Sequence, residues 1–161
     1  MTQKIVLAGG CFWGLEDLIR KQPGIINTTV GYTGGVVENP TYESHRGHAE
    51  AVEIEYDPEK TTLALIFDFF FRVHNPTTLN RQGNDVGDSY RSAIFYATAE
   101  EKQEAKQFID RVNRSGRWKD PVVTTLELLQ SFYPAEEYHQ DYLLKNPAGY
   151  TCHRIYTESY L

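Results

Sequence analysis

Cys11 is the residue of this chain whose position best suits a nucleophile. It follows an apolar run, residues 4–8, and two glycines, and it precedes a helical pattern that begins at Phe12. A thiol at the start of a helix lies among free backbone N–H groups at the positive end of the helix dipole, which lowers its pKa from about 8.5 to roughly 3.5–7.5. The sequence therefore predicts a reactive thiolate, and a small buried cysteine without chemistry is the alternative.

Two large aromatic residues, Phe12 and Trp13, follow the cysteine in the first helical turn. Rings at the edge of an element are rarely both fully buried, and Trp is seldom buried completely. An aromatic cup beside a nucleophile suits a small apolar group, and the methyl group of a thioether or sulfoxide packs well on aromatic rings. The pair therefore indicates a site for such a methyl group, with a role in the core as the alternative.

Glu50 is a candidate proton donor because of its place in an alternating segment. Residues 49–56 alternate with a period of two, so Glu50 shares a face with Val52, Ile54 and Tyr56. If that face is buried, desolvation raises the pKa of the carboxyl group and keeps it protonated near neutral pH. A neutral carboxyl group can act as a general acid. In the alternative interpretation, Glu50 lies beyond the core and is solvated.

Four further residues could take part in chemistry at such a site. Tyr42 and Tyr90 lie at loop–strand boundaries, where a phenol can donate to a polar oxygen or serve only the structure. Asp85 lies in a polar loop, where Asp is also a common turn residue. Cys152 lies near the C-terminus and is either an inert thiol or a mobile thiol that resolves an oxidised cysteine.

The composition is that of an ordinary soluble domain, which we expect to span residues 1–161. Hydrophobic residues make up 40% of the chain and charged residues 24%. The net charge of −6 argues against a nucleic-acid or anionic-membrane surface, and no apolar run is long enough for a transmembrane helix. The N-terminus lacks a signal-peptide pattern and the two cysteines lie far apart, so a cytoplasmic location is expected. The spacing of histidines and cysteines matches no metal-binding motif.

Sequence periodicity predicts an α+β fold. The predicted strands are residues 4–8, 25–32, 49–56, 90–97 and 122–128, and the predicted helices are residues 12–21, 61–73, 98–115 and 134–145. The first six elements follow a ferredoxin-like βαββαβ order. We therefore expect a two-layer α/β sandwich with a mixed sheet, followed by a C-terminal helix and an irregular tail.

Seven short motifs stand in order along the chain and together resemble the type A peptide methionine sulfoxide reductases. They are GCFWG at 10–14, GYTGG at 31–35, NPTY at 39–42, GHAEAV at 47–52, RQGND at 81–85, YRSAI at 90–94 and YHQDYL at 138–143. The likeness runs from about residue 4 to residue 152. The resemblance implies that Cys11 attacks the sulfoxide sulfur, that Phe12 and Trp13 hold the methyl group, and that Glu50 protonates the oxygen.

The resemblance also implies the roles of the remaining site residues, the substrate and the reductant. Tyr42 and Tyr90 would hydrogen-bond the sulfoxide oxygen, and Asp85 would help to bind the substrate backbone. The substrate would be the S epimer of methionine sulfoxide, in oxidised proteins or peptides and possibly as the free amino acid. Cys152 would resolve the sulfenic acid of Cys11 as a disulfide, and thioredoxin would reduce that disulfide. No cofactor is implied, and we expect a monomer.

Two departures from the family pattern bear on recycling. Many members carry a longer segment with a further cysteine between the NPTY and GHAE motifs, whereas here only ESHRGHA separates Tyr42 from Glu50. Many also carry two cysteines in a Gly-rich tail, whereas Cys152 is the single cysteine in this one. A relay of three thiols is thus excluded, and a one-cysteine reductase recycled without Cys152 stays an alternative.

Two other classes of function are compatible with a reactive cysteine. A cysteine hydrolase or acyltransferase would need a histidine base, for which His48 or His139 could be proposed. A non-catalytic module that binds oxidised methionine would need neither Cys11 nor Glu50. Turnover of separated S and R epimers with dithiothreitol distinguishes these classes from a reductase.

Overall fold

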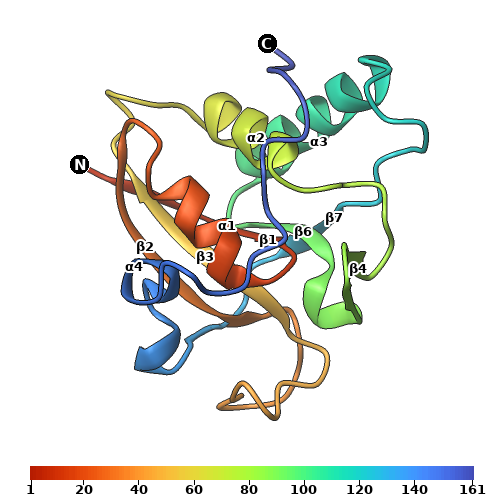
Figure 1. Ribbon diagram of the computed structural model, residues 1–161. Coiled ribbons are helices and arrows are strands. Elements are labelled where there is room, and N and C mark those ends of the chain that lie inside the picture. Colours follow the sequence, from red (N-terminus) through yellow and green to blue (C-terminus); the bar gives the residue numbers. More distant parts are fainter.

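The chain is organised around one six-stranded sheet, seen in a computed structural model that describes all 161 residues (Figure 1). The strands lie in the order β7-β6-β1-β3-β2-β8. They are β1 (Gln3–Gly9), β2 (Ile25–Thr33), β3 (Ala49–Tyr56), β6 (Ser92–Tyr96), β7 (Thr125–Leu128) and β8 (Phe132–Pro134). The helices are α1 (Phe12–Ile19), α2 (Leu63–Arg72), α3 (Ala99–Arg114) and α4 (Tyr142–Lys145). A small hairpin, β4 (Arg81–Gln82) with β5 (Asp85–Val86), stands apart from the sheet.

The sheet is mixed, because β6 and β7 are parallel and the other neighbouring strands are antiparallel. The predicted α+β class and mixed sheet are confirmed. At the centre, Val52 of β3 lies opposite Leu7 of β1 and Val30 of β2. This register matters for the site, because a shift of one residue would turn every side chain of β3 to the other face.

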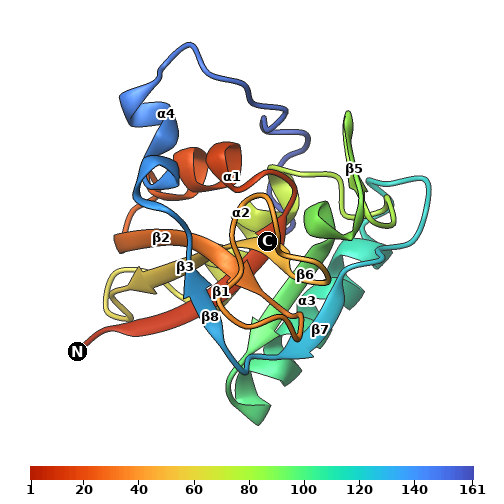
Figure 2. The ribbon, with the colours of Figure 1, turned by 90° about the horizontal axis from the view of Figure 1, so that it is seen from below.

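The two edge strands of the sheet are joined by a very short connection, so the sheet must curl. Only residues 129–131 separate β7 from β8, and that length of chain reaches about 14 Å. In a flat sheet the two edges would lie about 24 Å apart. Figure 2 shows the short connection that leads directly from the end of β7 to the start of β8. The enclosed face is lined by small side chains, among them Ala8, Ala49, Ala51 and Ala93, which leave room for this curvature.

The other face of the sheet carries the main core. Its side chains pack against those of α1, α2 and α3, including Phe12, Leu15, Phe67, Phe71 and Phe108. The alternation along β1 follows from this arrangement, since Ile5 and Leu7 join the main core while Val6 and Ala8 point to the enclosed face. Each helix therefore buries one apolar face against a sheet surface that is already apolar.

The helix predicted over residues 134–145 is wrong. Pro134 is instead the last residue of the edge strand β8, where a residue without an N–H group is tolerated. A 3-10 turn follows at Glu137–His139, and Asp141 has a φ of 52°, which interrupts a right-handed helix. Only Tyr142–Lys145 is α-helical. The strand predicted over 90–97 begins at Ser92, because Asp88–Tyr90 forms another 3-10 turn.

The last residues form an irregular tail, as predicted, and the tail crosses the helical side of the molecule (Figure 1). The N–H of Tyr156 donates to the carbonyl oxygen of Arg72, 2.7 Å away. Asp68 of α2 accepts hydrogen bonds from the N–H of Tyr160 at 2.7 Å and from the hydroxyl of Ser159 at 2.9 Å. No helix of the protein has both the length and the apolar character needed to cross a membrane.

We expect Asp68→Ala to lower the free energy of unfolding by about 1–3 kcal/mol, because it leaves the buried N–H of Tyr160 without a partner. Urea denaturation measures this change. The matched control is Ser159→Ala, which removes only the second hydrogen bond of the carboxylate and should have a clearly smaller effect. Equal losses from the two substitutions would show that the buried N–H group is not the cause.

Candidate active site

Cys11 lies where β1 turns into α1, at the N-cap position of the helix. The turn depends on Gly10, whose φ of 92° favours glycine. A Cβ atom at that position would also lie only 2.7 Å from the Cγ atom of Gln82. The side chain of Cys11 is 5% exposed. The predicted strand–glycine–helix junction is therefore present, but its thiol is more deeply buried than a helix start alone would suggest.

The pKa of Cys11 differs in direction from the sequence-based expectation. Burial raises the pKa of the thiol well above its ordinary value, and the charge of Glu50 raises it further. The backbone N–H of Trp13 lowers the pKa, as expected at a helix start, but this effect is outweighed. The predicted low pKa is wrong for the substrate-free protein, because desolvation depends on tertiary packing and not on the helix alone.

Glu50 is buried, with 1% of its surface exposed, so the solvated alternative is excluded. Its Oε1 atom accepts a hydrogen bond of 3.2 Å from the N–H of Phe12, the first residue of α1. Its Oε2 atom is buried and has no hydrogen-bond partner. Burial raises the pKa of Glu50 to about 8, and the charge of Asp85 adds to this. The carboxyl group is therefore protonated at neutral pH beside the nucleophile.

The charges of Glu50, Cys11 and Asp85 affect the pKa values of both Tyr42 and Tyr90. Burial and then the charge of Glu50 raise the pKa of Tyr42 to about 12, and the same two causes raise the pKa of Tyr90. Charges on Cys11 and Asp85 also contribute to both shifts. Tyr42 lies in the loop between β2 and β3, Asp85 lies in β5, and Tyr90 ends the 3-10 turn that follows. Both phenols stay neutral hydrogen-bond donors at physiological pH.

Cys152 lies against the β4–β5 hairpin. Its Sγ atom is 3.8 Å from Oδ2 of Asp85 and 3.9 Å from the carbonyl oxygen of Gln82. The hydroxyl of Tyr150 donates to the same Asp85 oxygen at 3.1 Å. Both cysteines are free thiols, and a charge on Cys152 is one of the causes that raise the pKa of Cys11. The tail therefore carries the second thiol to the side of the site that holds Asp85.

The tail is held in this place by its contact with α1. Nε2 of His153 lies 2.6 Å from the carbonyl oxygen of Gly9, just before the Cys11 turn. A Cβ atom on Gly14 would lie 2.3 Å from Oγ1 of Thr151 and 2.5 Å from Nδ1 of His153. Gly14 is thus required because the tail packs directly on its backbone.

The two aromatic residues after the cysteine differ in exposure. Phe12 is fully buried, 5.7 Å from Tyr32 between ring centroids, so only one of the two rings is buried completely, as expected. Trp13 is half-buried, and its Nε1–H group donates to Nδ1 of His139 at 2.9 Å. Tyr142 stacks on Trp13 with a centroid distance of 3.8 Å and an angle of 9°.

Sequence reasoning missed His139 and Tyr142 as neighbours of Trp13. Both lie in the YHQDYL motif, which contributes to the family resemblance. The motif does not indicate which part of the fold these residues contact. His139 is fully buried, and desolvation lowers the pKa of its ring, so it is neutral and can accept from the Trp13 indole. The aromatic wall of the site is therefore built from two segments more than 120 residues apart.

No histidine is hydrogen-bonded to Cys11. Nδ1 of His48 accepts from the N–H of Gly35 and Nε2 lies 2.7 Å from the carbonyl oxygen of Val37, while His139 is bonded to Trp13. Neither ring is therefore placed as the base of a cysteine hydrolase. No group of three or more His, Cys, Asp and Glu side chains is arranged to hold a metal ion.

Comparison with known proteins agrees with this geometry. The family model described as peptide methionine sulfoxide reductase matches residues 3–160. A peptide methionine sulfoxide reductase MsrA from Rhodopirellula baltica is 60% identical over 153 residues, which are 95% of this chain and 91% of the relative. The chain therefore belongs to the peptide methionine sulfoxide reductase family and is an enzyme of that class. The resemblance seen in the seven motifs is confirmed.

Solved structures of a related protein share the fold. Mxr1 from Saccharomyces cerevisiae in reduced form has a TM-score of 0.90 at 37% identity and covers 97% of this chain and 93% of its own. Mxr1 in complex with Trx2 has a TM-score of 0.69 at 28% identity and covers 97% of this chain and 91% of its own. The curled mixed sheet with its helices is thus the architecture of this family.

The first testable consequence of the site concerns Glu50. Its pKa of about 8 means that it can donate a proton below that pH and has lost the proton above it. We expect Glu50→Gln to lower the single-turnover rate of sulfoxide reduction roughly 10²–10⁴-fold. The decline in wild-type rate as the pH rises through 8 should be absent from the variant.

The matched control is Glu53→Gln on the same strand, where the carboxylate pairs with Lys4 at 3.6 Å and lies outside the site. This variant should keep both the rate and the pH profile of wild type. A Glu50→Gln enzyme with an unchanged single-turnover rate would show that the buried carboxyl group is only structural.

Proposed function

We propose that this protein reduces methionine S-sulfoxide to methionine, with Cys11 as the nucleophile and Glu50 as the proton donor. The observation that carries the proposal is the buried carboxyl group of Glu50. Its Oε1 atom accepts from the N–H of Phe12, next to Cys11, and its Oε2 atom has no protein partner. A neutral acid with a free oxygen beside a thiol is suited to a substrate that brings a basic oxygen.

The first step transfers the sulfoxide oxygen to Cys11. The sulfur of Cys11 attacks the sulfoxide sulfur while Glu50 donates a proton to the oxygen, where negative charge develops. The attack forms a bond between the two sulfur atoms. The substrate S–O bond then breaks and the oxygen passes as a hydroxyl group to the sulfur of Cys11, which becomes a sulfenic acid. The sulfur–sulfur bond breaks with its electron pair left on the substrate sulfur, and methionine leaves. The thiol proton of Cys11 restores the proton of Glu50, so the carboxyl group is not consumed.

The substrate is held by groups on both sides of the thiol. We assign the methyl group to Phe12 and Trp13, because these two aromatic residues follow Cys11 directly in the chain. Tyr42 and Tyr90 are neutral phenols in the electrostatic range of Glu50, which suits hydrogen bonds to the sulfoxide oxygen. Asp85 is assigned to the backbone of the substrate. With methyl and oxygen sites on fixed sides, only one epimer satisfies both, and the resemblance to the family implies that it is the S epimer.

The second step uses Cys152 as the resolving thiol. Its sulfur attacks the sulfenic acid, a Cys11–Cys152 disulfide forms, and the oxygen leaves as water. A dithiol then reduces the disulfide and restores both thiols. Support for this step comes from the tail, which places Cys152 in the electrostatic range of Cys11. The solved structure of Mxr1 in complex with Trx2 supports thioredoxin as the dithiol.

Several broader assignments accompany this mechanism. We propose that residues 1–161 form a single reductase domain with a ferredoxin-like centre, supported by the order β6-β1-β3-β2 and its antiparallel pairing. The partners are oxidised proteins or peptides and thioredoxin, and no cofactor is needed because the thiols carry the electrons. A cytoplasmic monomer is the proposed state, since a reducing compartment keeps both cysteines as thiols.

Cys11→Ser tests the nucleophile, with separated S and R epimers as substrates. Wild type should reduce the S epimer in dithiothreitol and leave the R epimer unchanged. The serine variant should reduce neither, because a hydroxyl group is a far weaker nucleophile at neutral pH. Its thermal unfolding should stay close to that of wild type. Turnover of the S epimer by Cys11→Ser, or equal rates on both epimers by wild type, would contradict the proposed site.

Cys152→Ser separates the two steps. The variant should still convert one equivalent of sulfoxide per enzyme, because Cys11 and Glu50 remain, and its mass should rise by one oxygen atom. Wild type treated in the same way should lose both thiols and gain an internal disulfide. Recycling by thioredoxin should fall sharply in the variant, whereas dithiothreitol can attack the sulfenic acid directly. Normal recycling of Cys152→Ser by thioredoxin would instead identify a one-cysteine enzyme.

A further inference from the structure

Glu16 is a buried carboxyl group that the proposed mechanism does not use. It lies on α1, one turn after Phe12, and none of its surface is exposed. Its Oε2 atom accepts from the hydroxyl of Thr28 on β2 at 2.8 Å. Its Oε1 atom accepts from the backbone N–H of Asp141 at 3.0 Å. Both oxygens therefore have donors, and the second donor belongs to a segment far away in sequence.

The segment bound by Glu16, residues 140–142, also contains the residue that packs on Trp13. Asp141 immediately precedes Tyr142, the residue that stacks on Trp13. Asp141 also has a left-handed φ of 52°, a conformation that a non-glycine residue adopts only where its surroundings require it. The hydrogen bond from its N–H to Glu16 supplies such a requirement, because it fixes the direction in which the chain leaves the 3-10 turn toward Tyr142.

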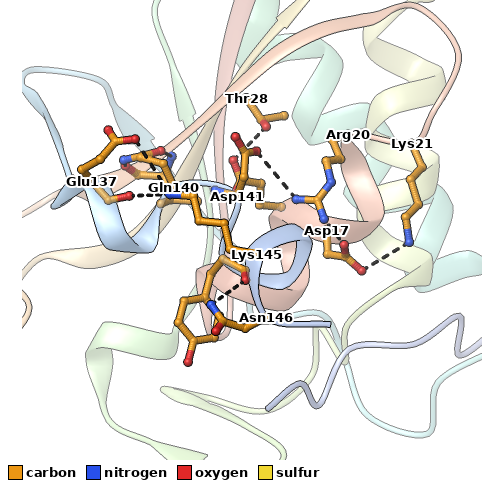
Figure 3. A network of polar contacts seen from close by, with 12 residues as sticks. Asp17, Arg20, Lys21, Thr28, Glu137, Gln140, Asp141, Lys145 and Asn146 are labelled. Atoms are coloured by element: carbon orange, nitrogen blue, oxygen red, sulfur yellow. Dashed lines mark hydrogen bonds and ion pairs between the residues drawn. The ribbon is translucent and has the colours of Figure 1, made fainter. Parts of the chain in front are cut away.

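Contacts of Gln140 and Asp141 with β2 and α1 also hold this segment in place. The side chain of Gln140 binds both the N–H and the carbonyl oxygen of Val30, at 2.9 Å each. Arg20 lies 3.8 Å from Oδ1 of Asp141, and its Nη1 atom has no hydrogen-bond partner. Figure 3 shows Thr28, Arg20, Gln140 and Asp141 converging between α1 and α4. Gln140 fixes the segment on β2, and Glu16 fixes its next residue on α1.

We infer that Glu16 is a positioning residue for substrate binding, which acts through Asp141 and Tyr142 to set the Trp13 wall of the methyl site. The inference rests on the proposed function, because it takes Trp13 as part of that site. A wall that holds the methyl group binds the ground state and the transition state alike. Its displacement therefore raises KM and leaves kcat unchanged.

Glu16→Leu tests this role, since leucine fills the space but accepts no hydrogen bond from Asp141. We expect KM for methionine S-sulfoxide to rise about tenfold, the effect of one lost buried hydrogen bond, with kcat unchanged in dithiothreitol. Trp13 also reports directly, because the chain has two tryptophans and the other, Trp118, binds Tyr160 away from the site. In a Trp118→Phe background, Glu16→Leu should shift the Trp13 emission to longer wavelength as the stack loosens.

Two variants serve as matched controls. Thr28→Val removes the other partner of Glu16 and keeps the bond to Asp141, so KM and Trp13 emission should stay at wild-type values even if stability falls. Glu16→Gln keeps an acceptor for the N–H of Asp141 and should rescue both readouts. If Glu16→Leu does not fold, Glu16→Gln still decides, because a tenfold rise in its KM would contradict a role through that hydrogen bond.

The outcomes separate this inference from the proposed function. A Glu16→Leu enzyme with wild-type KM and emission would overturn the positioning role, as would equal changes from Glu16→Leu and Thr28→Val. Failure of wild type to reduce any sulfoxide would refute the proposed function instead. In that case the Trp13 emission of the four proteins still shows whether Glu16 sets the wall.

Discussion

The carboxyl group of Glu50 lies inside the protein, with one oxygen bonded to the first N–H of α1 and the other without a partner. An ionised carboxylate in this position would lack most of the hydrogen bonds that water provides, so burial favours the neutral form. The register of β3 enforces the burial. Val52 must face Leu7 and Val30 in the core, and Glu50, two residues earlier, must point the same way. The packing of the sheet therefore keeps the carboxyl group of Glu50 buried and protonated.

Burial is the main cause that keeps the thiol of Cys11 undissociated. An ionised Glu50 would raise the pKa of Cys11 further, and its protonation removes that charge. The resting site thus contains an undissociated thiol beside an undissociated acid, flanked by two neutral phenols. Asp85 is half-exposed and accepts a hydrogen bond from Tyr150 of the tail. The carboxyl group of Glu50 and the phenols of Tyr42 and Tyr90 thus keep the protons that could be donated to a sulfoxide oxygen.

How much of this could be predicted from sequence follows from how local each feature is. The Gly10–Cys11–Phe12 junction and the alternation that puts Glu50 on the same face as Val52 depend on neighbours within a few residues, and the sequence predicts both correctly. Whether that face is buried at Glu50 stayed open. The raised pKa of Cys11 was not predicted, because it depends on packing across the sheet and against the tail. The helix over 134–145 failed for a similar reason, since β2 takes Pro134 as its edge partner. The contacts of Trp13 with His139 and Tyr142 have no local signal in the sequence.

The burial of Cys11 affects when its thiol can react. The reactivity of a cysteine toward oxidants follows its thiolate character and its exposure. Cys11 is nearly inaccessible, and the pKa values of both Cys11 and Cys152 are raised, first by burial in each case. A thiol in this state resists nonspecific oxidation. In the proposed mechanism, a sulfoxide bound against Glu50 accepts the carboxyl proton on its basic oxygen as the sulfur–sulfur bond begins to form. In that mechanism the substrate itself activates the thiol, so the site needs a buried acid and no permanent thiolate.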